Sequence, residues 1–273
     1  MADEGEQQLT GERTISPEIW LVCERCGGRT RPTGSPGRCR CGGLYSVEFP
    51  RPAVISTAAF EQRLGSWQPL DRSGVWRYRE LLPPLPLDRI VTRPEGNTNL
   101  YHHPRLAEWT GCADLLLKHE GENPTGSFKD RGMTVAISHA RAVGAQAVAC
   151  ASTGNTAASV AAYAALAGLP SIVFLPSGKI ATGKLSQAIA YGARIVQLTG
   201  DFDAAMQLVQ EASSELGLYL LNSVNPFRLE GQKSILFELL HQLGWELPDW
   251  IILPGGNLGN TAAFGAALMQ LRA

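Results

Sequence analysis

The sequence predicts an α/β protein built around a parallel β-sheet. From about residue 114 onward, short apolar runs alternate with longer segments in which apolar residues recur at spacings of three and four. This alternation is typical of strands followed by amphipathic helices. Hydrophobic residues make up 44% and charged residues 18% of the chain, which suits a protein with a substantial core. At 273 residues, we expect one large lobe or two smaller ones.

The predicted elements follow one another in a regular order. Strands are expected at residues 114–118, 147–151, 171–175, 194–198, 219–221 and 249–253. Helices are expected at residues 127–143, 156–166, 182–191 and 229–243, and from residue 260 onward. A further helix has one apolar face, formed by Phe202, Ala205, Met206, Val209, Ala212 and Leu216. Since parallel strands need crossover connections, helices should cover both faces of the sheet.

The region before residue 114 divides by composition. Residues 1–17 are polar and acidic, without an apolar stretch behind a basic start, and are predicted to be a disordered tail and no secretory signal. Residues 18–50 are rich in Gly, Arg and Pro and contain a cluster of cysteines. The prolines at positions 83, 84 and 86 forbid a regular helix there.

The cysteine cluster predicts a zinc ribbon. Its members form two pairs, Cys23-x2-Cys26 and Cys39-x-Cys41, separated by 12 residues. The second pair is one residue shorter than the usual C-x-x-C spacing. Four thiolates leave no open position on the metal, so we expect structural zinc. The alternative is a relic ribbon that binds no metal.

Charge and composition exclude several classes of protein. Lys and Arg number 24 against 25 Asp and Glu, which leaves a net charge of −1. The electrostatic basis for binding nucleic acid or an anionic membrane is therefore absent. No apolar segment has the roughly 20 residues needed to span a bilayer. Clustered cysteines in a chain of this size favour a reducing compartment, and we expect a cytoplasmic location.

Three strand-to-helix loops carry the candidate chemistry. Residues 123–131 (NPTGSFKDR) place Lys129 in the first turn of a helix, where the helix dipole lowers the pKa of an amine and makes it nucleophilic toward aldehydes. Residues 151–156 (ASTGNT) bring hydroxyls, an amide and free N–H groups together. The glycines of residues 254–260 (PGGNLGN) let consecutive N–H groups surround an anion. Together they predict a site for a phosphorylated aldehyde, with pyridoxal 5'-phosphate the obvious candidate. Taken singly, they could be a surface lysine, an ordinary N-cap and a tight turn.

Six segments carry a family resemblance. PTGSFKDRG, ASTGNTAAS, NSVNPFRLEGQKS and PGGNLGN, with GVWRYRELLP and EGNTN upstream, resemble the threonine synthase family of fold-type II pyridoxal-phosphate enzymes. The resemblance runs from about Gly74 to the last residue, and Asn99 stands where the family usually has proline. It implies a two-lobed architecture, with residues 51–131 and 226–273 in a large cofactor domain and residues 132–225 in a smaller domain. The large domain is expected to continue past residue 273, which would make the sequence an N-terminal fragment.

The resemblance also implies roles for individual residues. Lys129 would hold the cofactor as a Schiff base and move protons. The expected cofactor ligands are Lys129, Asn155, Gly255, Gly256, Asn257, Leu258 and Gly259. The expected ligands of a substrate phosphate are Ser152, Thr156, Asn222 and Arg228. The implied reaction converts O-phospho-L-homoserine and water to L-threonine and phosphate (EC 4.2.3.1), in a homodimer.

Other functions stay open at this point. One is a related enzyme of the same fold, either a threonine/serine dehydratase or a cysteate synthase acting on phosphoserine. Arg228 in NSVNPFR favours a substrate phosphate and argues against the dehydratase, unless it is merely a solvent-exposed arginine at the start of a helix. A different class is a non-catalytic zinc-ribbon binding protein with a degenerate enzyme domain. The intact Lys129 argues against degeneration.

Overall fold

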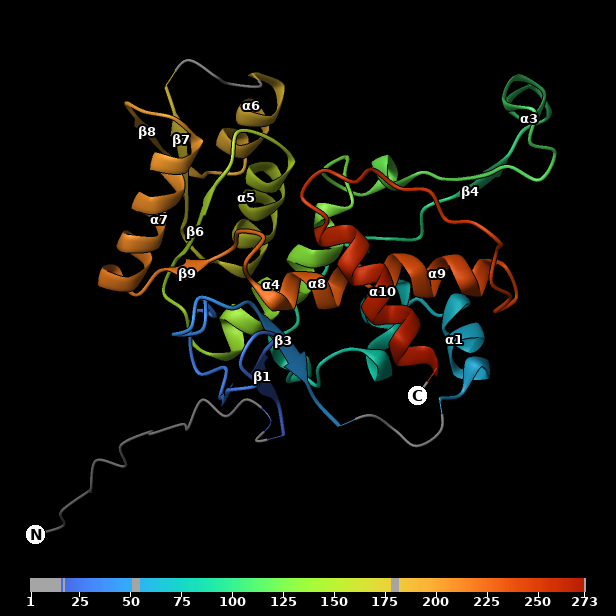
Figure 1. The fold of residues 1–273 in the computed structure, drawn as a ribbon, viewed down its shortest axis with the longest axis horizontal. Coiled ribbons are helices and arrows are strands. Elements are labelled where there is room, and N and C mark those ends of the chain that lie inside the picture. The colour runs from blue at the N-terminus through green and yellow to red at the C-terminus, as the bar shows by residue number, and fades with distance from the viewer. Residues whose placement is uncertain (1–15, 17, 51–54, 178–181, 273) are drawn as a thin grey trace, which may run out of the picture.

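A computed structural model describes residues 16, 18–50, 55–177 and 182–272 of the chain. Of the tail predicted for residues 1–17, only residue 16 is among the described residues. The described chain forms an N-terminal ribbon, a lobe built on a parallel sheet (the sheet lobe) and a mainly helical lobe (Figure 1). No helix among the described residues is long and apolar enough to cross a membrane.

The parallel sheet has the predicted architecture. Its strands are β6 (Val148–Ala151), β7 (Ser171–Pro176), β8 (Arg194–Leu198) and β9 (Tyr219–Leu220), in the order β8-β7-β6-β9. All three pairings are parallel. The connecting helices are α5 (Asn155–Ala167), α6 (Thr182–Ala190) and α7 (Phe202–Leu216). Figure 1 shows α7 on one side of the sheet and α5 and α6 on the other.

Alternation along each strand divides the buried side chains between the two faces. Val148, Cys150 and Val173 pack in the core that also contains α4 and α5. Ala149 and Phe174, one residue along, pack in the separate core beneath α7. Both faces are thereby covered, as an all-parallel sheet requires.

The N-terminal ribbon is a small antiparallel sheet attached to the sheet lobe. Its strands are β1 (Trp20–Cys23), β2 (Arg29–Thr30) and β3 (Tyr45–Glu48), in the order β2-β1-β3. Ile19, Leu21, Val47 and Phe49 belong to the same buried core as α4 and the sheet. The ribbon therefore contributes few apolar residues of its own and shares the core of its neighbour.

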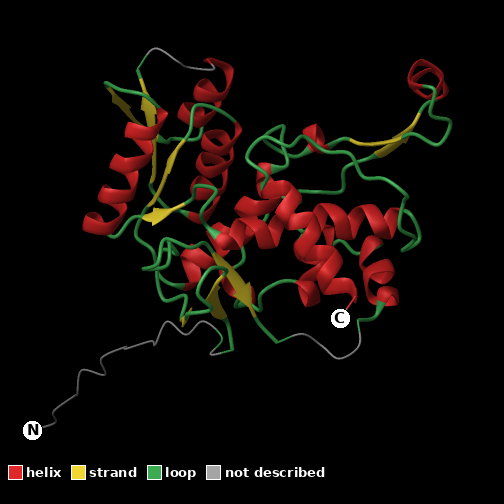
Figure 2. Cartoon of the chain, viewed as in Figure 1, coloured by secondary structure: helices red, strands yellow, loops and turns green. Residues whose placement is uncertain are grey.

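The helical lobe surrounds a second core. Its helices are α1 (Thr57–Leu64), α2 (Pro69–Arg72), α8 (Pro226–Gln232), α9 (Ser234–Gln242) and α10 (Gly259–Arg272), with 3-10 turns η1 (Trp76–Leu81) and η2 (Leu87–Arg89). Phe60, Tyr78, Phe237 and Phe264 are central to this core. An antiparallel pair, β4 (Leu100–His102) and β5 (Leu116–Lys118), extends from the lobe and carries α3 (Pro104–Thr110) at its far end (Figure 2). A 3-10 turn, η3 (Glu120–Glu122), follows β5.

Three predicted elements differ from the structure. Residues 249–253 form no strand, because no described strand pairs with them, and Trp250 and Ile252 are 85% and 93% exposed. An apolar run becomes a strand only where a neighbour accepts and donates its backbone hydrogen bonds. The strand predicted at 114–118 is the shorter β5, which pairs antiparallel with β4 outside the parallel sheet. The helix predicted at 229–243 is two helices, α8 and α9, that meet at Lys233.

Helix α4 (Lys129–Ala142) joins the lobes and crosses α8 at two glycines. A Cβ atom at Gly132 would lie 2.8 Å from the carbonyl oxygen of Arg228. One at Gly231 would lie 1.9 Å from the carbonyl oxygen of Arg131. The two backbones therefore touch, which only glycine permits. The predicted domain boundary between residues 131 and 132 falls inside α4, and the division into domains stays a prediction.

Candidate active site

Lys129 is the first residue of α4, and the loop before it is tightly held. Asp130, which is fully buried, accepts hydrogen bonds from the Thr125 backbone N–H (2.7 Å) and the Thr125 hydroxyl (2.6 Å). Its Oδ1 also accepts from the Ser159 hydroxyl of α5 at 2.6 Å. From α6, Lys184 Nζ donates to the Thr125 carbonyl at 2.9 Å. Three helices thus fix the loop that presents Lys129.

The pKa of Lys129 is lowered from 10.5 to about 8. Burial is the larger cause, because it disfavours the charged amine, and the positive charge of Arg228 adds to it. The lowered pKa agrees in direction with the sequence prediction, and burial and a neighbouring cation are causes that the sequence did not reveal. A lysine with this pKa supplies a neutral, nucleophilic amine near neutral pH.

Arg228, near the start of α8, is a buried cation for which the described residues supply no carboxylate partner. Arg228 is 2% exposed, which excludes the alternative of a solvent-exposed arginine at the start of a helix. Nη1 donates to the Leu221 carbonyl at 3.1 Å, whereas Nε is buried with no hydrogen-bond partner. No ion pair involves Arg228 within the described part of the chain. Burial lowers its pKa to about 10. A buried guanidinium with an unused donor is suited to receive an anion.

Asn222 and Ser152 come together at the carboxyl end of β6. The Asn222 side chain accepts from the Ala151 N–H and donates to the Ala151 carbonyl, both at 2.9 Å. These two hydrogen bonds to the backbone leave one hydrogen of the side-chain amide for a ligand. Ser152, the next residue, accepts from the Gly154 N–H at 3.2 Å. Asn222 therefore ties the segment after β9 to the polar loop after β6.

The N-terminus of α5 leaves its predicted ligands available. The residue before the helix, Gly154, provides no side-chain cap. Asn155 is exposed and Thr156 half-buried. Among the described residues, no side chain caps the first N–H groups of the helix, an arrangement that suits an anionic group.

Residues 255–259 form an exposed loop that ends where α10 begins at Gly259. Within the described chain, no acceptor is found for the backbone N–H groups of these residues. Leu258 has a left-handed φ of 61°, which a non-glycine residue rarely adopts. The unpaired N–H groups match the predicted phosphate loop. No direct contact joins this loop to Lys129 or Arg228 among the described residues, so its place in the same site is still a prediction.

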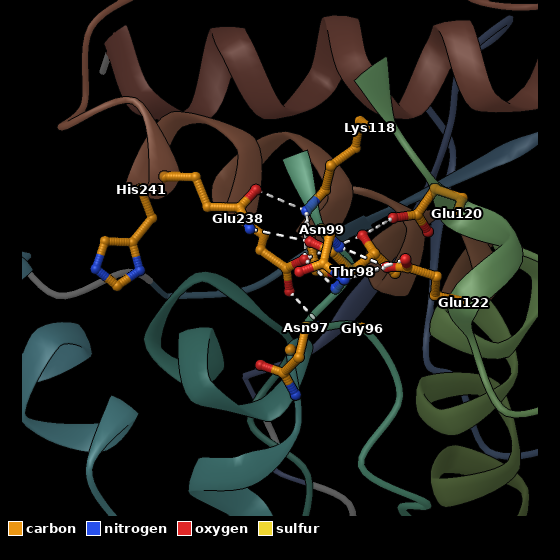
Figure 3. Close-up of polar contacts among 12 residues, drawn as sticks. Gly96, Asn97, Thr98, Asn99, Lys118, Glu120, Glu122, Glu238 and His241 are labelled. Atoms are coloured by element: carbon orange, nitrogen blue, oxygen red, sulfur yellow. Dashed lines mark hydrogen bonds and ion pairs between the residues drawn. The ribbon is translucent and has the colours of Figure 1, made fainter. Parts of the chain in front are cut away.

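A buried ionic network, which the sequence did not predict, is centred on Glu238, and Figure 3 shows Glu238 with Lys118 and Glu120. Glu238 of α9 pairs with Lys118 Nζ at 2.6 Å and with Arg131 Nη2 at 2.8 Å. It also accepts the backbone N–H groups of Asn97 (2.8 Å) and Thr98 (3.0 Å). Burial alone would raise the pKa of Glu238, but the charges of Arg131 and Lys118 lower it to about 2.

The same network includes Glu120, whose Oε1 pairs with Arg131 Nη2 at 2.7 Å. It connects the EGNTN segment to α4 and α9, and so supports the helix that carries Lys129. The available sequence signal was a charge inside an apolar run, as in LFELL around Glu238. Its partners could not be inferred, because Lys118 lies 120 residues away.

Asn99 forms bonds that the usual proline could not. Its backbone N–H donates to Glu122 Oε2 at 2.6 Å, and its side-chain amide donates to both carboxylate oxygens at 3.1 Å. The hydrogen bonds donated by the Asn99 backbone N–H and the Tyr101 hydroxyl lower the pKa of Glu122 to about 2. The departure from the family pattern therefore ties the end of the EGNTN segment to η3.

The four clustered cysteines also meet in space. The Sγ atoms of Cys23, Cys26, Cys39 and Cys41 all lie within 4.8 Å of one another. They lie in the ribbon, apart from the residues around Lys129, and are free thiols.

Comparison with known proteins gives the family. Residues 91–273 match the family described as pyridoxal-phosphate dependent enzymes. The chain belongs to this family. Its fold is similar to that of threonine synthase from Escherichia coli, with a TM-score of 0.62 at 21% identity over 92% of this chain and 61% of that one. The fold is thus the expected fold-type II architecture.

Two relatives of this family member are named threonine synthase. The protein from Methanosarcina acetivorans is 54% identical over 246 residues, covering 89% of this chain. The protein from Methanocaldococcus jannaschii is 46% identical over 241 residues, covering 88% of this chain. The matched part covers 58% of the length of each of these two relatives.

The residues present fit the cofactor of the family. Lys129 offers an amine with a lowered pKa to an aldehyde. The N–H groups of residues 255–259 have no acceptor within the described chain and suit a phosphate. Asn155 is exposed at the N-terminus of α5, three residues after Ser152. Each of these groups would suit a different part of pyridoxal phosphate.

Proposed function

We propose that this chain carries the reacting lysine and the substrate-phosphate site of a threonine synthase, which converts O-phospho-L-homoserine and water to L-threonine and phosphate. The observation that carries the proposal is Arg228. It is a buried cation with an unpartnered Nε and no ion pair among the described residues, close enough to Lys129 to lower the pKa of that amine. Such a group favours a substrate that brings its own anion to the reacting lysine.

The proposed ligands of the two phosphates are separate. Residues 255–259 and Asn155 would hold the cofactor, together with Lys129. Ser152, Thr156, Asn222 and Arg228 would hold the substrate phosphate. Asn222 supports this grouping, because its bonds to Ala151 place it next to Ser152. Two separate phosphate sites would account for the unpaired Nε of Arg228 on α8 and for the unpaired backbone N–H groups of residues 255–259 before α10, among the described residues.

The part played by the chain follows from its own groups. Bound pyridoxal phosphate supplies an electron sink for the substrate carbon next to the amino group. Lys129 Nζ, about half neutral near pH 8, would accept the proton that this carbon loses. Arg228 would orient the phosphate that departs. Its positive charge would also lower the pKa of Lys129, so that this amine is neutral before it accepts the proton. The Asp130 hydrogen bonds would hold Lys129 in place meanwhile.

The same proposal covers the remaining sequence expectations. It assigns residues 51–131 and 226–273 to a large domain and residues 132–225 to a smaller one. It also includes a homodimer, which the family resemblance supports, and a cytoplasmic location, which the clustered cysteines favour. Light scattering of the purified protein tests the dimer.

The test compares substrates and one variant. Purified protein should form threonine and phosphate from O-phosphohomoserine, and should act poorly on threonine or phosphoserine. Arg228→Ala should lower kcat/KM for O-phosphohomoserine. The corresponding loss of transition-state stabilisation should be about 2–5 kcal/mol, the scale for losing a buried charge-assisted partner. Cofactor absorbance and occupancy should not change.

The exposed Arg105→Ala serves as the matched control and should leave both quantities unchanged. If Arg228→Ala releases the cofactor but spares phosphate discrimination, the two anion sites have been interchanged. Efficient turnover of threonine would instead indicate a dehydratase, and efficient turnover of phosphoserine a cysteate synthase. Borohydride reduction and peptide mapping should place the cofactor on Lys129. If no cofactor is attached to Lys129, the result would support the alternative of a non-catalytic binding protein with a degenerate enzyme domain.

A further inference from the structure

The four ribbon thiols already have the spacing of a tetrahedral metal site. Cys23 Sγ lies 3.5 Å from Cys41 Sγ, and Cys26 Sγ lies 3.7 Å from Cys39 Sγ. In a tetrahedral zinc–thiolate site with Zn–S bonds of about 2.3 Å, neighbouring sulfurs are about 3.8 Å apart. A disulfide would require about 2.05 Å. The thiols are thus too far apart for disulfides and near the spacing of a shared metal.

The backbone explains the short second pair of cysteines. In the first turn, the Cys23 N–H donates to the Gly28 carbonyl and the Gly27 N–H to the Cys23 carbonyl, both at 2.9 Å. In the second turn, the Cys39 N–H donates to the Gly43 carbonyl (3.0 Å) and the Gly42 N–H to the Cys39 carbonyl (2.7 Å). The second turn repeats the same two bonds with one residue fewer. The C-x-C spacing therefore preserves the turn that presents the thiols.

Space and charge around the cluster also suit a metal. A Cβ atom at Gly43 would lie 2.6 Å from Cys23 Sγ and 3.3 Å from Cys41 Sγ, so glycine leaves room for these sulfurs. Arg25 Nη1 donates to the Cys41 carbonyl (2.8 Å) and Arg38 Nη1 to the Gly42 carbonyl (3.0 Å). Four thiolates on one Zn²⁺ leave a net charge of −2, which these nearby guanidinium groups offset.

The segment between the two cysteine pairs contacts the sheet lobe at strand β9. Ser35 Oγ accepts the Leu220 N–H at 2.8 Å. The Pro32 carbonyl lies 3.2 Å from Nε2 of His139 on α4, and Nδ1 of that ring is 2.6 Å from the Tyr219 hydroxyl. Since the Pro32 oxygen can only accept, Nε2 carries the hydrogen and Nδ1 accepts from Tyr219. The ribbon segment is thus connected to two adjacent residues of β9.

These contacts matter because β9 is a short edge strand. Only two of its residues pair with β6. The Leu221 N–H points inward to the Ala149 carbonyl (2.8 Å), whereas the Leu220 N–H points outward and has Ser35 as its acceptor. The strand leads directly into Asn222 and α8. The ribbon therefore supports the outer side of the strand that precedes the proposed phosphate ligands.

We propose that Cys23, Cys26, Cys39 and Cys41 bind one structural Zn²⁺, and that the zinc-folded ribbon fixes edge strand β9 from its outer side. The ribbon shares the apolar core of the sheet lobe and has little of its own, so metal binding supplies the free energy that orders it. The zinc has four protein ligands and no open position, and its role is structural. This inference is independent of the proposed catalytic function.

Metal analysis tests the site itself. Wild-type protein purified without chelator should contain about one zinc per chain. Replacement by Co²⁺ should give the intense visible absorption of a tetrahedral thiolate site. The double variant Cys26→Ser/Cys39→Ser should lose the metal, whereas Cys112→Ser, at an exposed cysteine outside the cluster, should keep it. Metal-free wild-type protein, or protein loaded with iron in place of zinc, overturns the assignment.

Amide hydrogen exchange tests the connection to β9. Removing zinc with a chelator should accelerate exchange at Leu220. Ser35→Ala leaves the cysteines intact and should accelerate Leu220 exchange roughly fivefold, the factor for one lost hydrogen bond, without changing zinc content. Leu221, whose N–H bonds to Ala149, is the internal control in that variant and should not respond. Unchanged Leu220 exchange after zinc removal overturns the support of β9, even if the metal is bound.

Discussion

The sheet lobe and the junction between the lobes are held together by opposite means. Under α5, the sheet lobe is closed by small apolar side chains such as Val160, Ala161 and Val173, all fully buried. At the junction, Arg131 and Glu238 form an ion pair in a position almost as deeply buried, with Lys118 beside it. The stability of the sheet lobe depends on how well its side chains fill the core. The stability of the junction depends on the balance of buried positive and negative charges. The two regions should therefore respond differently to single substitutions.

The difference teaches where the fold tolerates change. An apolar core loses stability in proportion to the area and volume removed. A buried ion pair gains little over an apolar replacement of both partners, but the loss of one partner leaves an uncompensated charge. We expect the junction to be the more sensitive region, although it contains fewer residues.

The largest expected effect is at Glu238. Glu238→Gln should lower the free energy of unfolding by about 3–5 kcal/mol, because Lys118 loses its carboxylate partner and Arg131 keeps only Glu120. Urea denaturation measures this loss. Glu48→Gln is the matched control, since Glu48 forms an exposed ion pair with Arg29 at 2.9 Å, and it should cost less than about 1 kcal/mol. Equal effects at the two sites would contradict the comparison.

The Glu238 effect should also depend on pH. The pKa of Glu238 is about 2 in the folded protein, against an ordinary value of 4.5. Between these values the unfolded chain binds the extra proton, so stability falls as pH falls. The difference between wild type and Glu238→Gln should be full above pH 4.5 and shrink toward pH 2. A difference independent of pH would exclude this cause.

An intermediate effect is expected in the sheet core. Val173→Ala removes two buried methyl groups from β7 and should lower the free energy of unfolding by about 2 kcal/mol, through lost burial and the cavity left behind. Thermal or urea unfolding measures it. Leu166→Ala, at a residue 53% exposed on α5, should change stability by about 0.5 kcal/mol or less. A loss at Val173 as large as that at Glu238 would remove the distinction between the regions.

The smallest effect is expected at Lys129, where an amine is partly buried beside a second cation. In cofactor-free protein at pH 7, Lys129→Met should raise the free energy of unfolding by about 0.5–2 kcal/mol, because it removes a partly buried charge beside Arg228. The pKa of Lys129 is about 8 when folded, against an ordinary 10.5. Between these values wild-type stability rises with pH, so the gain should vanish above pH 10.5. Destabilisation at pH 7 would contradict this account.

The sheet lobe could be predicted from sequence because its signals are local. The strand expected at residues 194–198 is β8, and the apolar spacing after residue 201 gave α7. Residues 249–253 had an equally apolar pattern, but a strand also needs a partner, which no pattern within five residues reveals. The ionic network was hidden for a similar reason, since Glu238 lies more than 100 residues from both Lys118 and Arg131.

The candidate site was predictable in its components and less so in its geometry. Sequence motifs identified Lys129 and Arg228 separately, each at the start of a helix. That Arg228 is buried, and that its charge lowers the pKa of Lys129, depends on the packing of α4 against α8. Asn222 was expected only as a phosphate ligand, and its two bonds to Ala151 became visible only when β9 was placed beside β6.

The glycine crossing of α4 and α8 has a consequence for how such an enzyme can diverge. With Gly132 and Gly231 in backbone contact, any side chain at either position forces the helices apart and disturbs Lys129 and Arg228 together. A substitution at either glycine should therefore change the surroundings of Lys129 and Arg228 at the same time. The loops at residues 152–156 and 222–225 lie outside this crossing, so side chains there can change without altering the distance between the helices.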